Sequence, residues 1–295
     1  MNDLIDLSAL RPSRLAQLSA LLVGGPDARA FLQGQLSAEM EELRPDRARL
    51  ASCNSAQGRV QAVLWLVERL DGVALVLPDS MLESIAVRLR KYVLRSKVRI
   101  DPAAGRLAAG VLDRGVLSGA ATPTADRSHI EQSGVSLVHL PGHTQILTLA
   151  NAPDWNDADA GVDRTWRLDH IRAGLPQVYP ETHEAFVAQM LNIDALDGIS
   201  FSKGCYTGQE IIARTHYRGA IKRRMFRFKA TCPPPAPGTR IAAGDQHAGD
   251  VVDAVATAGG CELLAVVSLA QARRALELET PKGAMLEPQT LPYGW

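Results

Sequence analysis

The chain has 295 residues, of which 46% are apolar and 22% are charged, as is ordinary for a folded globular protein. Its 32 basic residues balance its 32 acidic ones, which excludes a protein that coats nucleic acid and makes any anion site local. No segment approaches the roughly 18 apolar residues of a membrane helix. The first residues include Asp3 and Asp6 and lack the apolar core of a secretory signal. We therefore expect a cytoplasmic protein with no membrane partner.

The first half of the chain predicts alternating hairpins and helices. Residues 17–23 predict a strand, which a turn and a helix capped by Asp27 follow. Apolar segments on both sides of Asp71-Gly72 predict a hairpin. Apolar residues at helical spacing predict a helix from Asp79 to Val93, and residues 106–112 begin another β unit. Hairpins mixed with helices indicate an α+β fold with antiparallel sheets.

The clearest boundary is the proline-rich segment 231–238, Thr-Cys-Pro-Pro-Pro-Ala-Pro-Gly. Four prolines in five positions cannot continue a helix or a central strand. The short apolar segments that follow are separated by glycines and predict a small β-barrel. The predicted domains are therefore residues 1–230, an α+β region of two interleaved subdomains, and residues 231–295, the barrel.

Residues 203–229 form the candidate functional segment, with eight basic residues and one acid in a neutral chain. Thr207-Gly-Gln-Glu210 matches a capping box and predicts a helix that starts near Gly208 and ends near Gly219. Cys205 is then expected at the positive end of the helix dipole and close to Lys203, and both features favour a thiolate. The alternative is that Cys205 is a small buried apolar residue.

The cations that follow Cys205 indicate an anionic ligand or partner, because they outnumber what helix capping requires. They begin with Arg214 and Arg218 and continue through Arg223. A solvated helix face is the alternative, and it is the preferred interpretation for a second basic run at 88–99. No group of cysteines and histidines has metal-ligand spacing, so no metal site is expected.

The octapeptide Lys203-Gly-Cys-Tyr-Thr-Gly-Gln-Glu210 resembles the signature of the YgfZ family, folate-binding proteins related to the aminomethyltransferase of glycine cleavage. The resemblance covers nearly the whole chain and is visible at residues 25–35, 91–98, 192, 198–201, 218–223 and 291–293. It implies a three-part ring of two units that resemble ferredoxin-like domains and a C-terminal β-barrel. It also implies tetrahydrofolate as the ligand of the central hole.

The resemblance implies a catalytic role for Cys205 as the reactive thiol, with Lys203 as its electrostatic partner. It further implies these cofactor-binding residues: Trp166, Leu18, Arg172, Tyr206, Gln209, Arg214, Arg218 and Arg223. Two of them depart from the family pattern, since Leu18 stands where relatives often carry an aromatic residue and Arg172 where they carry a carboxylate. The aminomethyltransferase has an Asp pair where this chain has 58–62, Gly-Arg-Val-Gln-Ala, so glycine cleavage is not expected.

The implied function is assistance in the synthesis or repair of iron–sulfur clusters in client enzymes, such as tRNA methylthiotransferases, with an indirect effect on tRNA modification. One alternative is a folate-dependent one-carbon transferase or demethylase. Another is an RNA-binding module, against which the neutral charge and the 5% aromatic content argue. We expect a monomer that does not bind nucleic acid directly.

Overall fold

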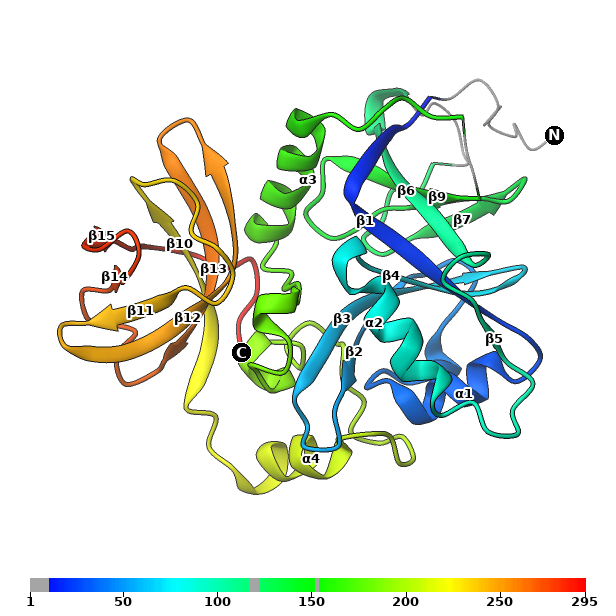
Figure 1. The fold of residues 1–295 in the computed structure, drawn as a ribbon, viewed down its shortest axis with the longest axis horizontal. Helices are drawn as coiled ribbons and strands as arrows, with labels where there is room; N and C mark the ends of the chain where they lie inside the picture. The colour runs from blue at the N-terminus through cyan, green and yellow to red at the C-terminus, as the bar shows by residue number, and fades with distance from the viewer. Residues whose placement is uncertain (1–10, 117–121, 152–153) are drawn as a thin grey trace.

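The computed structural model describes residues 11–116, 122–151 and 154–295, which form two antiparallel sheets with helices around them (Figure 1). The first sheet has nine strands in the order β2-β3-β4-β1-β6-β9-β8-β7, and β5 pairs with β1. Their bounds are β1 Ser13–Gly24, β2 Arg49–Asn54, β3 Val60–Arg69, β4 Gly72–Pro78, β5 Arg99–Ile100, β6 Arg106–Asp113, β7 His129–Gln132, β8 Val135–Val138 and β9 Gln145–Ala150. The predicted α+β fold is confirmed, and its two units share one continuous sheet.

The strand β1 joins the two halves of this sheet. It pairs with β4 along one edge, where Leu21 lies opposite Leu75. It pairs with β6 along the other edge, where Ala20 lies opposite Leu107. All four side chains are buried, as expected for a central strand that is apolar over most of its length.

Two helices pack beside this sheet, α1 Ala28–Gln35 and α2 Asp79–Arg90. The apolar residues that predicted α2 form its buried face: Met81, Leu82, Ile85, Ala86 and Leu89. The predicted cap of α1 is only partly right. Asp27 is the N-cap residue, but its side chain makes no cap hydrogen bond and instead accepts one from the backbone N–H of Lys97 at 2.7 Å.

Helix α3, Ala160–Arg172, stands between the two sheets and contacts β1 on one side and the second sheet on the other (Figure 1). Asp159 caps it by accepting from the backbone N–H groups of Gly161 and Val162. The other helical segments are η1 Met40–Glu42, η2 Arg114–Val116, η3 Pro180–Thr182, η4 Ala188–Leu191 and α4 Gln209–Arg218. No helix within the described ranges has the length and apolar character to span a membrane.

The second sheet has seven strands in the order β15-β14-β11-β12-β13-β10-β16 and curls into a nearly closed barrel. Their bounds are β10 Arg223–Ala230, β11 Arg240–Ala243, β12 Gln246–Thr257, β13 Gly260–Ser268, β14 Glu277–Leu278, β15 Ala284–Met285 and β16 Glu287–Gln289. The predicted barrel is confirmed. The first of these strands along the chain is β10, however, and it precedes the proline-rich segment. That segment therefore connects two strands of the same sheet and lies inside the C-terminal unit. The reason is that β10 pairs with β13 and buries Met225 and Phe228.

Candidate functional site

The loop 203–208 packs against the turn 54–58 of the first sheet. Gly208 has a φ of +85°, and a β-carbon there would lie 2.5 Å from the carbonyl oxygen of Ser55. Gly58 has a φ of +70°, and a β-carbon there would lie 2.8 Å from the Cβ of Ile211. Both conformations and both contacts require glycine. The two glycines thus fix where α4 begins.

The predicted capping box at the start of α4 is wrong. The N-cap residue is Gly208, in the left-handed conformation, and no side chain caps the helix. The side chain of Gln209 instead braces the preceding loop. It accepts from the N–H of Tyr206 at 3.3 Å and donates to the carbonyl of Lys203 at 3.4 Å. Gln209 was predicted to bind the cofactor, but both ends of its side-chain amide form hydrogen bonds within the loop itself.

Lys203 is buried and points into the protein. Its ammonium donates to the carbonyls of Leu36 at 3.0 Å and Ala38 at 2.7 Å, and it lies 5.1 Å from the ring centre of Tyr206. Burial lowers the pKa of Lys203 to about 8, although Glu39 opposes the shift. Lys203 anchors the loop, and its predicted electrostatic effect on Cys205 stays a prediction.

Tyr206 is also a packed residue, with only 6% of its surface exposed. Its hydroxyl has no hydrogen-bond partner among the residues that the structure describes, and burial raises the pKa of Tyr206 to about 12. Its predicted role in cofactor binding is not visible in these contacts.

Cys205 is the exposed thiol of the protein. The chain has four cysteines, all in described ranges, and Cys53, Cys232 and Cys261 are buried. Burial raises the pKa of Cys53, and burial together with Cys232 raises the pKa of Cys261 to about 12. The alternative of a buried Cys205 is excluded, and its role as the reactive thiol stays a prediction.

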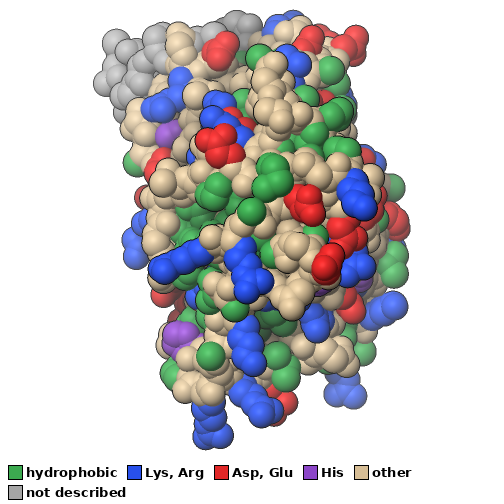
Figure 2. Space-filling view, turned by 90° about the vertical axis from the view of Figure 1, so that its left-hand side faces the viewer, with side chains coloured by type: hydrophobic (Ala, Val, Ile, Leu, Met, Phe, Trp, Pro, Cys, Tyr) green, Lys and Arg blue, Asp and Glu red, His purple; other side chains and the backbone are tan. Residues whose placement is uncertain are grey.

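Of the three predicted cofactor-binding arginines of this segment, two lie on α4 and one does not. Arg214 and Arg218 are exposed and make no ion pair with any residue in the described ranges. Arg223 lies on β10, where it pairs with Asp250 at 3.7 Å. Figure 2 shows Lys and Arg side chains gathered at the lower end of the molecule, where Figure 1 places α4.

Exposed and stacked aromatic residues accompany these cations. The ring of Phe201 stacks on His216 with 3.8 Å between the centroids. Tyr217 packs edge-on against His216 and is 67% exposed. The surface beside Cys205 therefore combines aromatic and cationic groups.

Trp166 and Leu18 lie together between α3 and β1, as the family resemblance implies. They line two small cavities of about 10 Å³ each. The indole ring of Trp166 packs on His143 at 4.3 Å and on His170 at 5.2 Å between centroids. Its Nε1 is buried and has no hydrogen-bond partner among the described residues.

A buried polar network, which was not expected from the sequence, lies next to Trp166. Arg167 donates to the carboxylate of Asp253 and, at 2.8 Å, to the carbonyl of Ala254. The hydroxyl of Tyr179 donates to the same carboxylate at 2.9 Å. Burial raises the pKa of Asp253, although Arg167 and Tyr179 oppose the shift. The signal in the sequence is a single acid inside the apolar run 251–255, Val-Val-Asp-Ala-Val.

Two histidines complete the surroundings of Trp166. The Nε2 of His143 lies 2.6 Å from the Nδ1 of His170. Burial lowers the pKa of His143 to about 4 and holds the pKa of His170 well below its usual value. Both imidazoles are therefore neutral at neutral pH.

These side chains leave no room for the pterin of a folate. A cavity of about 10 Å³ holds roughly one water molecule, whereas a pterin is a fused two-ring system. Arg167 and Asp253 neutralise each other, and Leu18 gives the cavities an aliphatic wall. In the conformation described, the residues beside Trp166 do not fit this ligand.

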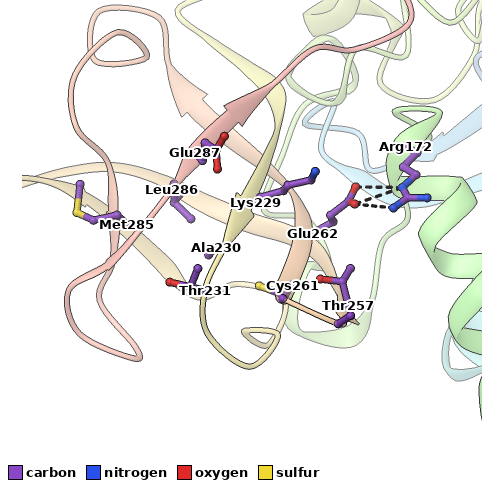
Figure 3. Close-up of a pocket in the computed structure, with 12 residues that line it drawn as sticks. Arg172, Lys229, Ala230, Thr231, Thr257, Cys261, Glu262, Met285, Leu286 and Glu287 are labelled. Carbon is purple, nitrogen blue, oxygen red and sulfur yellow. Dashed lines mark hydrogen bonds and ion pairs between the residues drawn. The ribbon is translucent and has the colours of Figure 1, made fainter.

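Arg172 does not face Trp166, contrary to the implied role in cofactor binding. It lines a separate cavity of about 620 Å³ on the barrel (Figure 3) and donates to the carboxylate of Glu262 at 2.7 and 3.3 Å. Only 2% of the Glu262 side chain is exposed, and a buried carboxylate needs a cation. Burial opposes ionisation of Glu262, but Arg172 lowers its pKa. The pairing explains why Arg172 turns toward the barrel.

In the part of the chain that the structure describes, no group of three or more His, Cys, Asp or Glu residues could hold a metal ion. What remains is an exposed thiol in a fixed loop, with a cationic helix beside it. The arrangement can present Cys205 to a second molecule.

No family model matches the chain. The tRNA-modifying protein YgfZ of Serratia proteamaculans is 33% identical over 272 residues, which are 86% of this chain and 82% of that protein. The protein of the same name from Yersinia enterocolitica is 35% identical over 221 residues, 68% of this chain and 66% of its own. The glycine cleavage system aminomethyltransferase T of Bartonella henselae has the same fold, with a TM-score of 0.68 over 95% of this chain and 84% of its own at 12% identity. The chain belongs to the YgfZ family.

Proposed function

We propose that the protein supports tRNA modification indirectly, by assisting the synthesis or repair of iron–sulfur clusters in client enzymes. The observation that carries this proposal is Cys205, an exposed thiol in a loop anchored by buried neighbours. The names of the relatives add the connection to tRNA modification.

The proposed role of Cys205 follows from thiolate chemistry. Thiolates are the ligands that hold iron–sulfur clusters in proteins. An exposed thiol on an anchored loop can release its proton to solvent and bind, as the thiolate, an iron atom of a cluster in a second protein that has an open coordination position. The client's cluster is the substrate here, and the protein needs no metal site of its own for this step.

The surface beside Cys205 supports a protein partner. Tyr217 is 67% exposed and Ile211 is 36% exposed, and both lie on α4 with Arg214 and Arg218. Exposed aromatic residues and arginines are enriched in protein interfaces. We assign α4 as the docking element for the client enzyme.

Tetrahydrofolate is the ligand that the family resemblance implies. Because the small cavities beside Trp166 do not accommodate a pterin, the proposed chemistry includes no folate step. The one-carbon transferase alternative also lacks support, since Gln61 replaces the expected acid and its amide group is already bound to Glu184 and Arg88.

The test replaces Cys205 with Ala or Ser in a bacterial strain that depends on this chain because its own family member is deleted. Methylthiolated tRNA nucleosides are measured by mass spectrometry, and cluster content is measured in the purified client enzyme. Both should fall in the Cys205 variants and stay unchanged in Ser202→Ala, a change at an exposed residue directly before this loop. Wild-type values in a stably folded Cys205→Ala variant would refute the thiol role.

A further inference from the structure

A second charged cavity lies beside the turn between η1 and β2. Its volume is about 470 Å³. Seven charged side chains line it: Glu42, Arg44, Asp46, Arg47, Arg49, Arg127 and Asp197. None of them belongs to the loop of Cys205 or to the surroundings of Trp166, and the proposed function does not use them.

The backbone holds the arginines of this cavity in place. Arg44 and Arg47 are the first and last residues of a turn that the Arg47 N–H closes on the Arg44 carbonyl at 3.1 Å. Pro45 occupies the second position, where its fixed φ suits the turn. The N–H of His129 binds the carbonyl of Asp46 at 2.8 Å and ties the turn to β7. The two arginines therefore extend from a fixed base.

Two other arginines are largely buried and share one acid. The side chains of Arg49 and Arg127 are 13% and 15% exposed. Both approach Asp197, at 3.6 Å and 3.1 Å respectively, and Arg49 also pairs with Glu42. Glu42 and Asp197 are thus already engaged by these two guanidinium groups.

Positive charge and a hydrogen-bond donor remain unsatisfied. Arg44 and Arg47 are exposed and form no ion pair with any residue that the structure describes. The Nε of Arg49 is buried and has no partner among those residues. Burial lowers the pKa of Arg127, Asp197 opposes this, and the charge of Arg47 adds to the lowering. An anion in the cavity would relieve the repulsion among the arginines.

We propose that this cavity binds the phosphate group of a small phosphorylated compound. Guanidinium groups match phosphate oxygens through paired hydrogen bonds, and a phosphate offers several acceptors to several arginines. The volume falls within the range of about 300–1,000 Å³ for small-molecule sites. The three carboxylates around the cavity repel an extended polyanion, which favours a compact ligand over a nucleic-acid backbone.

Pyrophosphate is the probe for the test, by isothermal titration calorimetry of the full chain at low ionic strength. The wild-type protein should bind it, and Arg44→Gln and Arg47→Gln should each raise the Kd about tenfold or more. Arg273→Gln is the matched control, because Arg273 is also exposed, forms no ion pair with any residue that the structure describes, and lies on the barrel. It should leave the Kd unchanged. Melting temperatures verify that each variant is folded.

Two results would overturn the proposal. One is the absence of pyrophosphate binding by the wild-type protein, and the other is an unchanged Kd in the Arg44→Gln, Arg47→Gln double variant. A second titration adds a single-stranded RNA oligonucleotide without a terminal phosphate, which should not displace pyrophosphate. If the RNA displaced pyrophosphate at a concentration below that of pyrophosphate, the site would be assigned to a nucleic-acid backbone and the small ligand would be rejected.

Discussion

Gly58 and Gly208 lie so close together that a β-carbon on Gly208 would be 3.1 Å from the Cα of Gly58. Replacing Gly208 with Ala should therefore lower the free energy of unfolding by more than about 2 kcal/mol, through its positive φ and the clash with Ser55. Chemical denaturation measures the effect. Gly204→Ala is the control in the same loop, because a β-carbon there meets no atom within 4 Å. Equal stability of the two variants would contradict the packing described.

Thiol reactivity should separate Cys205 from the other cysteines. A thiol reagent such as Ellman's reagent should modify one cysteine per native chain rapidly and the remaining three only after unfolding, because Cys53, Cys232 and Cys261 are buried. The Cys205→Ser variant should lose the rapid phase, whereas Cys232→Ser should keep it. A rapid phase that survives Cys205→Ser would show that another thiol is accessible.

Buried histidines should make the protein sensitive to acid. Burial lowers the pKa of His129 and of His143 from 6.5 to about 4. Between about pH 4 and pH 6.5 these histidines bind more protons in the unfolded chain than in the folded one. The free energy of unfolding is therefore unaffected above about pH 6.5 and falls as the pH drops toward 4. For His129 the loss should reach about 3 kcal/mol. Denaturation curves at several pH values measure the slope, which should be smaller in His129→Gln. An unchanged slope in that variant would reject the assignment.

The small volume of the cavities beside Trp166 predicts that tetrahydrofolate produces no saturable change in the fluorescence of Trp166. Trp166→Phe is the reference, since it removes this indole and leaves the other three tryptophans. A saturable change in the wild-type protein that is absent in Trp166→Phe would show that the cavity opens for a folate. The Cys205 experiments do not depend on this outcome, so the two ideas fail or succeed separately.

The strands and the barrel could be predicted from the sequence because apolar runs and turn residues mark them directly, as at Asp71-Gly72, where the chain turns from β3 into β4. Helix α3 could not, because it carries charged residues around much of its surface while burying Trp166 and His170 between two sheets. Such a helix has no simple apolar stripe. Only tertiary contacts from both sheets define which of its side chains are inside.

The candidate site, like the fold, could be predicted from the sequence only in part. The exposure of Cys205 and the closeness of Leu18 to Trp166 agree with what the motif and the family resemblance suggest. The capping box failed because a left-handed glycine, rather than Thr207, begins α4. Arg172 was misplaced because its partner, Glu262, is 90 residues away in the chain. Pairs of charges distant in sequence leave no local pattern.

The position of β1 has a consequence for the motions of the molecule. Because β1 pairs with β4 on one edge and β6 on the other, the two α+β units share their backbone hydrogen bonds and cannot rotate as separate bodies. The first sheet is continuous across β1, and its central amides should exchange with solvent only through global unfolding. A rearrangement that admits the proposed client would therefore take place in the loops around Cys205 or between the sheet and the barrel.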